Sequence, residues 1–167
     1  MSKSSENLKT AFAGESMANR RYTAFARKAD QAGLPQIAHL FRAVAAAETV
    51  HGLNHFRAME GVKETPENIQ VCIAAENYEV VSMYPEMLAA AQEEGDKRAA
   101  QSFNYAWQVE KIHEGQYRQA AETLAQGKDL PEIEYYVCPV CGNTHEGPLV
   151  GRCPICNTPG EKFEKIA

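Results

Sequence analysis

Several features are scarce in this sequence, and each absence narrows the class of protein. No stretch of 18 apolar residues occurs, and the N-terminal MSKSSENLKTAFAGE lacks an apolar core of signal-peptide length. Lys and Arg are scattered, and the formal net charge is −5 at pH 7, so a broad basic face for nucleic acid is not expected. We therefore expect a soluble, cytoplasmic protein that binds neither membranes nor nucleic acid.

Cysteine is also rare, with 5 among 167 residues, and its use is concentrated near the C-terminus. Cys138, Cys141, Cys153 and Cys156 follow the spacing C-x2-C-x11-C-x2-C. Two such knuckles bring four thiolates around one metal, and this usage favours a reducing compartment over disulfides. The spacing alone leaves zinc and iron both open. Cys72 stands apart and is expected to be a buried small hydrophobe.

Helical periodicity without strand alternation fills the chain up to Gly127. Gly and Pro interrupt it, so that four long helices are predicted, at about 5–31, 35–60, 65–95 and 96–126. Pro85 lies inside the third stretch, but AAAQEE resumes the helical pattern soon after it. We therefore expect Pro85 to kink that helix without ending it.

The composition changes after Gly127, where Pro, Gly, Cys and Tyr replace Ala, Glu and Gln. The remaining segment is too short to hold a core by itself, and a bound metal would supply the missing stability. The sequence thus predicts a mainly α protein with two domains, a four-helix domain over residues 1–130 and a small metal-bound β module over residues 131–167.

The helical part repeats itself with an offset of 62 residues. The matching positions are Tyr22/Tyr84, Ala29/Ala91, Gly33/Gly95, Ala38/Ala100, Phe41/Phe103, Glu48/Glu110 and His51/His113. Glu15 and Glu76 are only 61 apart, so the third helix carries one extra residue between Glu76 and Tyr84. A π-bulge is the expected way for a helix to hold that residue.

Two Glu-x-x-His motifs, Glu48 with His51 and Glu110 with His113, each place a carboxylate and an imidazole one turn apart on a helix face. Both motifs lie among small and apolar residues, where an unpaired charge is expensive. A solvated helix face would explain one such motif taken alone. Two motifs on alternate helices favour metal binding instead.

Glu15 and Glu76 are further glutamates in small-residue surroundings on the other two helices. Two inward-facing glutamates together with two Glu-x-x-His motifs form the ligand set of a di-iron or di-manganese carboxylate bundle. Such a site would also accept zinc. Glu79 adds one carboxylate beyond this minimal set.

These features together resemble the rubrerythrin family over nearly the whole chain. The resemblance rests on FAGESMANRRY, AAAETVH, AENYEVVSMYPEM and VEKIH, and on the knuckles CPVCG and CPICN. It implies a ferritin-like four-helix bundle with a non-haem di-iron centre, joined to a rubredoxin-like Fe(SCys)4 module. It further implies reduction of hydrogen peroxide for oxidative-stress protection. Electrons would come from an NAD(P)H-dependent reductase, with or without a separate rubredoxin, and would pass through the cysteine-bound iron.

The resemblance also implies a role for each matching residue. It gives bridging ligands Glu48 and Glu110, terminal ligands Glu15 and Glu76, histidine ligands His51 and His113, and rubredoxin-type ligands Cys138, Cys141, Cys153 and Cys156. Glu79 matches a carboxylate that exchanges with a histidine, here His51, as the irons change oxidation state. Tyr22 and Tyr84 match tyrosines near the cluster. Glu79, His51, Tyr22 and Tyr84 are therefore the implied catalytic residues.

The linker between the second and third helices departs from the ferritin-like pattern, in which a long crossover spans the bundle. Only residues 61–65 are available here, and five residues reach at most about 18 Å. A helix of about 27 residues is roughly 40 Å long. Either the helices run up-down-up-down or the hairpins exchange between two chains. The complete ligand set favours a swapped homodimer.

Other functions remain open from the sequence. One is a ferritin-like ferroxidase that handles iron and carries a structural zinc ribbon, and another is a non-enzymatic metal-binding or redox-sensing protein. The cysteine module and Glu79 speak against iron storage, which needs neither. The fourth helix continues for about 16 residues, or roughly 24 Å, beyond Glu110. The module must therefore fold back or dock on another subunit, and we expect the second.

Overall fold

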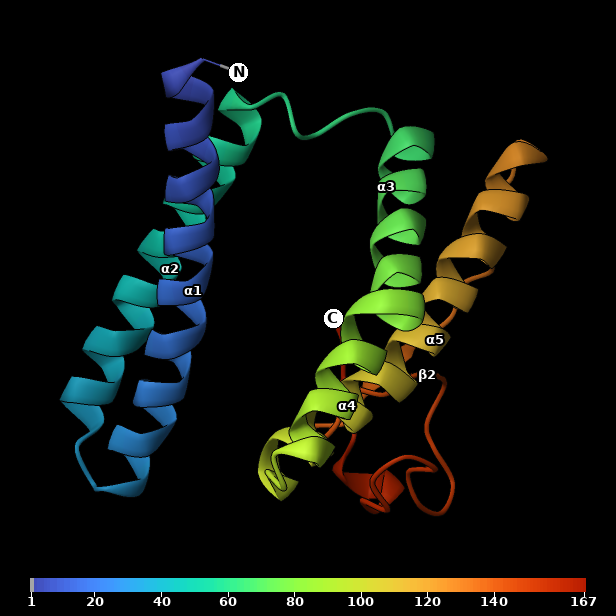
Figure 1. Cartoon of the computed structure of the whole chain (residues 1–167). Coiled ribbons are helices and arrows are strands. Elements are labelled where there is room, and N and C mark those ends of the chain that lie inside the picture. Colours follow the sequence, from blue (N-terminus) through green and yellow to red (C-terminus); the bar gives the residue numbers. More distant parts are fainter. Residues whose placement is uncertain (1) are drawn as a thin grey trace. The chain divides into compact units, whose positions relative to one another are not determined.

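The computed structural model describes residues 2–167, which form two compact units that meet in sequence between Lys63 and Glu64. Each unit contains a pair of helices lying side by side (Figure 1). The boundary predicted between the two domains, at residues 130/131, is drawn from the change in amino-acid composition. It stays a prediction. None of the helices described over residues 2–167 combines the length and apolar character that a bilayer crossing requires.

The first unit is a hairpin of α1 (Lys3–Gln31) and α2 (Pro35–Ala58). The predicted start at residue 5 is too late, because the Ser2 hydroxyl accepts a hydrogen bond from the Ser5 N–H (3.2 Å) and caps the helix. Small side chains fill the contact between the two helices, where the buried residues include Ala26, Ala29, Ala38 and Ala45. The two backbones can therefore approach closely.

The second unit begins with a helix in three parts, followed by one long helix. The parts are α3 (Thr65–Tyr78), the π-helical segment η1 (Glu79–Met83) and α4 (Tyr84–Glu93), and the long helix is α5 (Lys97–Ala125). Because η1 lies between Glu76 and Tyr84, the predicted π-bulge is confirmed. The helix also continues through Pro85, as predicted.

Three short antiparallel strands follow α5. They are β1 (Tyr135–Val137), β2 (Thr144–Glu146) and β3 (Glu164–Lys165), in the order β2-β1-β3. A 3-10 turn, η2 (Gly160–Lys162), precedes β3. The buried centre of this module consists of Cys138, Cys153 and Phe163. A core in which cysteines take so large a part agrees with the expectation that a metal stabilises the module.

Each hairpin, taken by itself, leaves large apolar side chains uncovered. Leu40 and Val50 of the first unit are 63% and 56% exposed. Val71 and Val81 of the second unit are 64% and 61% exposed. Exposed apolar residues of this kind are typical of one half of a helical bundle before it meets the other half. Neither hairpin therefore has the surface of a finished domain.

We expect Gly160→Ala to disrupt the β module, because a Cβ at this position would overlap the carbonyl group of Leu149. The variant should lose the cysteine-bound metal more readily than the unchanged protein. Gly115→Ala on α5 is the matched control, since an added Cβ there meets nothing within 4 Å. It should be neutral or stabilising by up to about 1 kcal/mol. Metal analysis after chelator treatment tests this, and equal metal retention by both variants would contradict it.

Candidate metal centre

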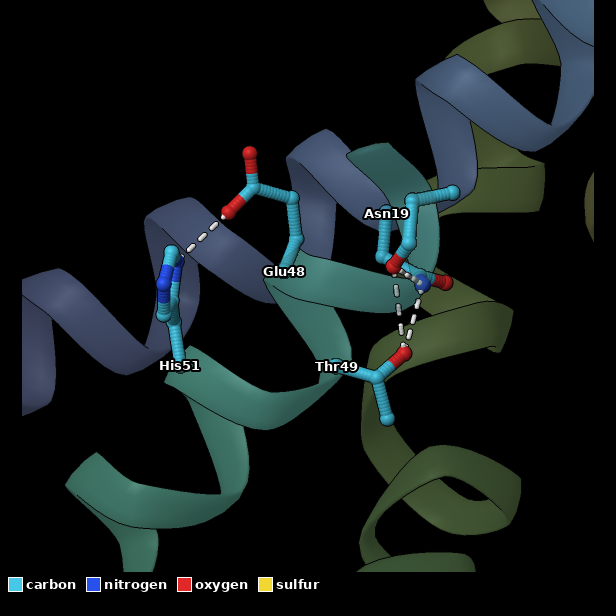
Figure 2. Close-up of polar contacts among 5 residues, drawn as sticks. Asn19, Glu48, Thr49 and His51 are labelled. Atoms are coloured by element: carbon cyan, nitrogen blue, oxygen red, sulfur yellow. Dashed lines mark hydrogen bonds and ion pairs between the residues drawn. The ribbon is translucent and has the colours of Figure 1, made fainter. Parts of the chain in front are cut away.

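The first cluster joins Glu15 on α1 to Glu48 and His51 on α2. One ligand atom from each side chain lies within 4.8 Å of the other two. The Nδ1 atom of His51 lies 2.9 Å from Oε2 of Glu48. Figure 2 marks this contact with a dashed line. Gly52 on α2 lies at the contact with α1, where an added Cβ would be 3.8 Å from the Cβ of Glu15, an ordinary packing distance. Helix packing thus brings together three of the ligands predicted from the sequence.

A buried amide holds the two helices together beside the first cluster. Asn19 on α1 is only 8% exposed, and its Nδ2 donates to the Ala45 carbonyl (2.6 Å) and to Oγ1 of Thr49 (2.8 Å) on α2. Figure 2 shows the contact between Asn19 and Thr49 next to Glu48. The Oδ1 atom of Asn19 accepts from Nε of Arg20 (2.8 Å). Because its amide is fully paired, Asn19 fixes the register of the hairpin without the cost of an unsatisfied polar group.

The second cluster joins Glu76 on α3 to Glu110 and His113 on α5, again with one ligand atom from each within 4.8 Å of the others. The Nδ1 atom of His113 lies 2.6 Å from Oε2 of Glu110. Beside the cluster, Nδ2 of Asn77 donates to Oε1 of Glu114 (3.0 Å) and ties α3 to α5. Both clusters have the same composition and the same contact between Nδ1 and a carboxylate. The sequence repeat is therefore a repeat of the site.

Crowding of acidic groups raises the proton affinity of the second cluster. Burial and the neighbouring Glu110 carboxylate raise the pKa of Glu76 to about 7. The hydrogen bond to Glu110 raises the pKa of His113 above its ordinary value. Protons are thus held where the ligand groups converge, and a divalent cation would displace them. Carboxylate and imidazole donors suit iron or manganese.

Glu79 and Tyr84 lie at the edge of the second cluster. Glu79 stands in η1, outside the cluster itself, and burial together with Glu110 raises its pKa. Burial and the charge of Glu79 raise the pKa of Tyr84, so the phenol stays protonated at neutral pH. Tyr22 belongs to the first hairpin, where its ring packs against Phe25 with centroids 6.4 Å apart. The catalytic roles of these residues stay predictions.

The four cysteines converge within the β module. Their Sγ atoms all lie within 4.8 Å of one another, and Cys138–Cys156 and Cys141–Cys153 are each 3.5 Å apart. A tetrahedral site with metal–sulfur bonds of about 2.3 Å places its sulfur atoms about 3.8 Å apart, whereas a disulfide holds them at about 2.05 Å. The arrangement therefore fits one tetrahedral metal and no disulfide.

Both knuckles have the same backbone turn. Gly142 and Asn157, the residues that follow the second cysteine of each pair, have positive φ angles of 83° and 63°. Their N–H groups donate back to the carbonyls of Cys138 (3.0 Å) and Cys153 (2.9 Å). Glycine and asparagine are the residues that adopt this left-handed conformation most readily. The fifth cysteine, Cys72 on α3, is half-buried rather than fully buried.

The cysteine module lies against α5 at the second cluster. Oγ1 of Thr144, on β2, is 2.9 Å from Nε2 of His113, and Nε2 of Gln116 donates to the Thr144 carbonyl (3.3 Å). The Thr144 hydroxyl also donates to the Gly142 carbonyl (3.3 Å), and in that arrangement its oxygen is the acceptor for an Nε2–H of His113. The module folds back along its own chain, because these contacts bring β2 to the middle of α5 rather than beyond its end. This is the alternative to the docking on another subunit that we expected.

We expect Glu76→Gln to change how the stability of the metal-free protein depends on pH. The pKa of Glu76 is about 7 in the folded protein against an ordinary 4.5, so the stability contributed by its protonated form is present below pH 4.5 and is lost as the pH rises to about 7. The variant should unfold at a higher temperature above pH 7 and show a flatter pH dependence. Thermal unfolding across pH 4 to 8 measures this. Glu122→Gln, at an exposed position of α5, is the control, and equal slopes in both variants would contradict the expectation.

Known proteins resemble this chain over both its helical part and its cysteine module. A family model described as Rubrerythrin matches residues 6–121, and one described as Rubrerythrin, rubredoxin-like domain matches residues 136–164. Rubrerythrin-2 of Clostridium acetobutylicum is 33% identical over 171 residues, which cover 94% of this chain and 93% of that protein. Nigerythrin of Nitratidesulfovibrio vulgaris is 38% identical over 173 residues, which cover 95% of this chain and 84% of that protein.

A solved structure of nigerythrin in its fully reduced, all-ferrous state matches with a TM-score of 0.56 and 33% identity, covering 99% of this chain and 88% of that one. The predicted mainly α, ferritin-like fold with a rubredoxin-like module is confirmed. The family's cofactors are a carboxylate–histidine di-iron centre and a rubredoxin-like metal site, and the two clusters and the four cysteines offer donors of these types. The chain therefore belongs to the rubrerythrin family.

Proposed function

We propose that this chain is a non-haem di-iron peroxidase that reduces hydrogen peroxide to water and protects the cell against oxidative stress: H2O2 + 2 e− + 2 H+ → 2 H2O. The observation that carries the proposal is the hydrogen bond between Thr144 of the cysteine module and His113 of the second cluster. It links a one-electron site to a carboxylate–histidine site within one chain. Oxidation and storage of iron need no such link, whereas repeated reduction of a substrate does.

The residues in and beside the two clusters have different proposed roles in the reaction: metal binding, hydrogen bonding and charge balance. Iron, when bound, supplies electrons and polarises the peroxide oxygen. Glu76, Glu110 and His113 would hold it in the second hairpin, and Glu15, Glu48 and His51 would hold it in the first. Tyr84, whose raised pKa keeps its phenol protonated at neutral pH, is the proposed hydrogen-bond donor at the edge of the site. As the family resemblance implies, Glu79 would exchange with His51 and its negative charge would balance the charge of a more oxidised site.

Electrons are proposed to enter at the four-cysteine site and to leave it through Thr144. Only Gly142 and Asn143 separate Cys141 from Thr144 in the chain, and the Thr144 hydroxyl reaches the His113 imidazole at 2.9 Å. The route is therefore short and mostly covalent. The proposed donor is an NAD(P)H-dependent reductase, acting directly or through a separate rubredoxin, as the family resemblance implies.

The complete di-iron site is proposed to need two chains. Each hairpin supplies two glutamates and one histidine, so the two clusters together make the full ligand set. The linker is too short for the ferritin-like crossover within one subunit. The apolar side chains left exposed on both hairpins are consistent with burial in a shared bundle. In the proposed homodimer the first cluster of one chain meets the second cluster and Glu79 of its partner.

Peroxide addition to the reduced protein under anaerobic conditions tests the proposed activity. Stopped-flow absorbance should show the ferric cysteine-site colour returning within the same mixing experiment, with two electrons consumed per peroxide. A colourless module with no peroxide consumption would favour the ferroxidase with a zinc ribbon. We expect Glu79→Ala to bind iron yet to slow this re-oxidation by about 10-fold or more. Glu86→Ala, at an exposed position of α4, is the control and should behave like the unchanged protein.

Complementation between two inactive variants tests the exchange of hairpins. One variant carries Glu48→Ala and His51→Ala, and the other carries Glu110→Ala and His113→Ala. Neither should assemble a di-iron site alone. A mixed dimer with exchanged hairpins has one site with no intact half and one site that is fully intact, so about half of the wild-type peroxidase activity should return. No recovery in a purified, differently tagged heterodimer would rule out the exchange.

A further inference from the structure

The π-helical segment leaves one backbone carbonyl without a partner in its own helix. The N–H of Tyr84 donates to the carbonyl of Glu79, five residues earlier, as a π turn requires. In an α-helix that N–H would serve Val80 instead. The next candidate donor to Val80 would be residue 85, but Pro85 has no N–H. The Val80 carbonyl therefore has neither the α-type nor the π-type donor.

A side chain on the neighbouring helix supplies the missing donor. Nε1 of Trp107 on α5 donates to the Val80 carbonyl at 2.8 Å. Lys111, one turn further along α5, places its Nζ 3.6 Å from the centre of the indole ring, a distance typical of cation–π contacts. The indole is thus held at its Nε1–H by the helix backbone and over its ring face by a cation. Its orientation is well defined, because both contacts involve the same rigid ring.

The first hairpin also has a side-chain hydrogen bond to a backbone carbonyl of the neighbouring helix, but there the donor is on the first helix of the pair. There the donor, Asn19, is on the first helix and the acceptor is the Ala45 carbonyl on the second (2.6 Å), near Glu48, which Figure 2 also labels. Trp107 is the counterpart of Ala45 at the offset of 62 residues. In the second hairpin the donor has moved to the second helix, because the acceptor is now the carbonyl that the π turn exposes on the first.

We propose that Trp107 is a positioning residue that fixes the π turn at residues 79–83 and thereby orients Glu79 toward the second cluster. Without the indole, the Tyr84 N–H is drawn back to the Val80 carbonyl in an α turn. The helix still contains the one extra residue that the π turn accommodates. The π turn must therefore shift to another position along the helix. That shift rotates Glu79 away from Glu76, which lies one turn earlier. The inference rests on the proposed function only in that it takes Glu79 to be a metal ligand.

Mn2+ binding to the full-length protein with iron in its cysteine site tests this positioning role. Mn2+ prefers oxygen and nitrogen donors over thiolates, so the free ion counted by electron paramagnetic resonance reports the carboxylate–histidine sites. Trp107→Phe should weaken Mn2+ binding about 10-fold, and Glu79→Ala should do the same. Adding Trp107→Phe to Glu79→Ala should change affinity less than about 2-fold, because both act through one carboxylate. Tyr105→Phe on α5 is the control and should bind normally.

Pro85→Ala provides a rescue that a merely structural tryptophan would not show. It supplies an N–H at the position from which a π turn would donate to Val80. Trp107→Phe combined with Pro85→Ala should therefore recover most of the lost affinity. Benzothienylalanine in place of Trp107 keeps the ring shape but has no N–H, and it should lower Mn2+ affinity as much as Trp107→Phe does. This replacement tests the proposal even if the smaller phenylalanine ring unfolds the hairpin.

Three results would overturn the assignment. They are unchanged Mn2+ affinity with benzothienylalanine, equal losses from Trp107→Phe with and without Glu79, and no recovery from Pro85→Ala. All of these are binding measurements on the metal site. They are therefore separate from the failure of peroxide turnover, which would overturn the proposed function while leaving the role of Trp107 intact.

Discussion

The dominant constraint on this molecule is the repulsion between carboxylates that helix packing brings together in half-buried surroundings. The pKa of Glu76 rises to about 7 because burial and Glu110 both oppose its charge, and each histidine pairs with a glutamate of its own helix. A protein gains nothing in stability from such an arrangement by itself. It is explained when cations balance the charge, which is what the family's di-iron site provides.

Much of the site could be predicted from the sequence because its parts are local. In Glu-x-x-His and Cys-x-x-Cys the ligands lie within one turn of each other, so spacing alone fixes their relative directions. The extra residue before Tyr84 was likewise visible as a change of offset, and η1 is its structural form. The predicted helix ends differ by a few residues, because the capping role of Ser2 depends on a single hydroxyl.

The supporting contacts could not be predicted, because their partners are far apart in sequence and chemically unlike. Asn19 contacts residues 26 and 30 positions away, and Trp107 contacts a carbonyl 27 positions away. The internal repeat does not reveal them either, since Trp107 corresponds to an alanine. Every residue has a backbone carbonyl, so the sequence does not indicate which carbonyl accepts a side-chain hydrogen bond. Such contacts follow only from the packed structure.

Thr144 connects the cysteine module to the second cluster through its contact with His113. When its hydroxyl donates to the Gly142 carbonyl, its oxygen accepts the Nε2–H of His113, and this arrangement favours a proton on Nε2. Nδ1 is then directed at Glu110, where a metal would bind. If the module did not contact α5, no group of the module would favour one tautomer of the His113 imidazole. The fold-back of residues 126–134 therefore makes the cysteine site part of the environment of the carboxylate–histidine site.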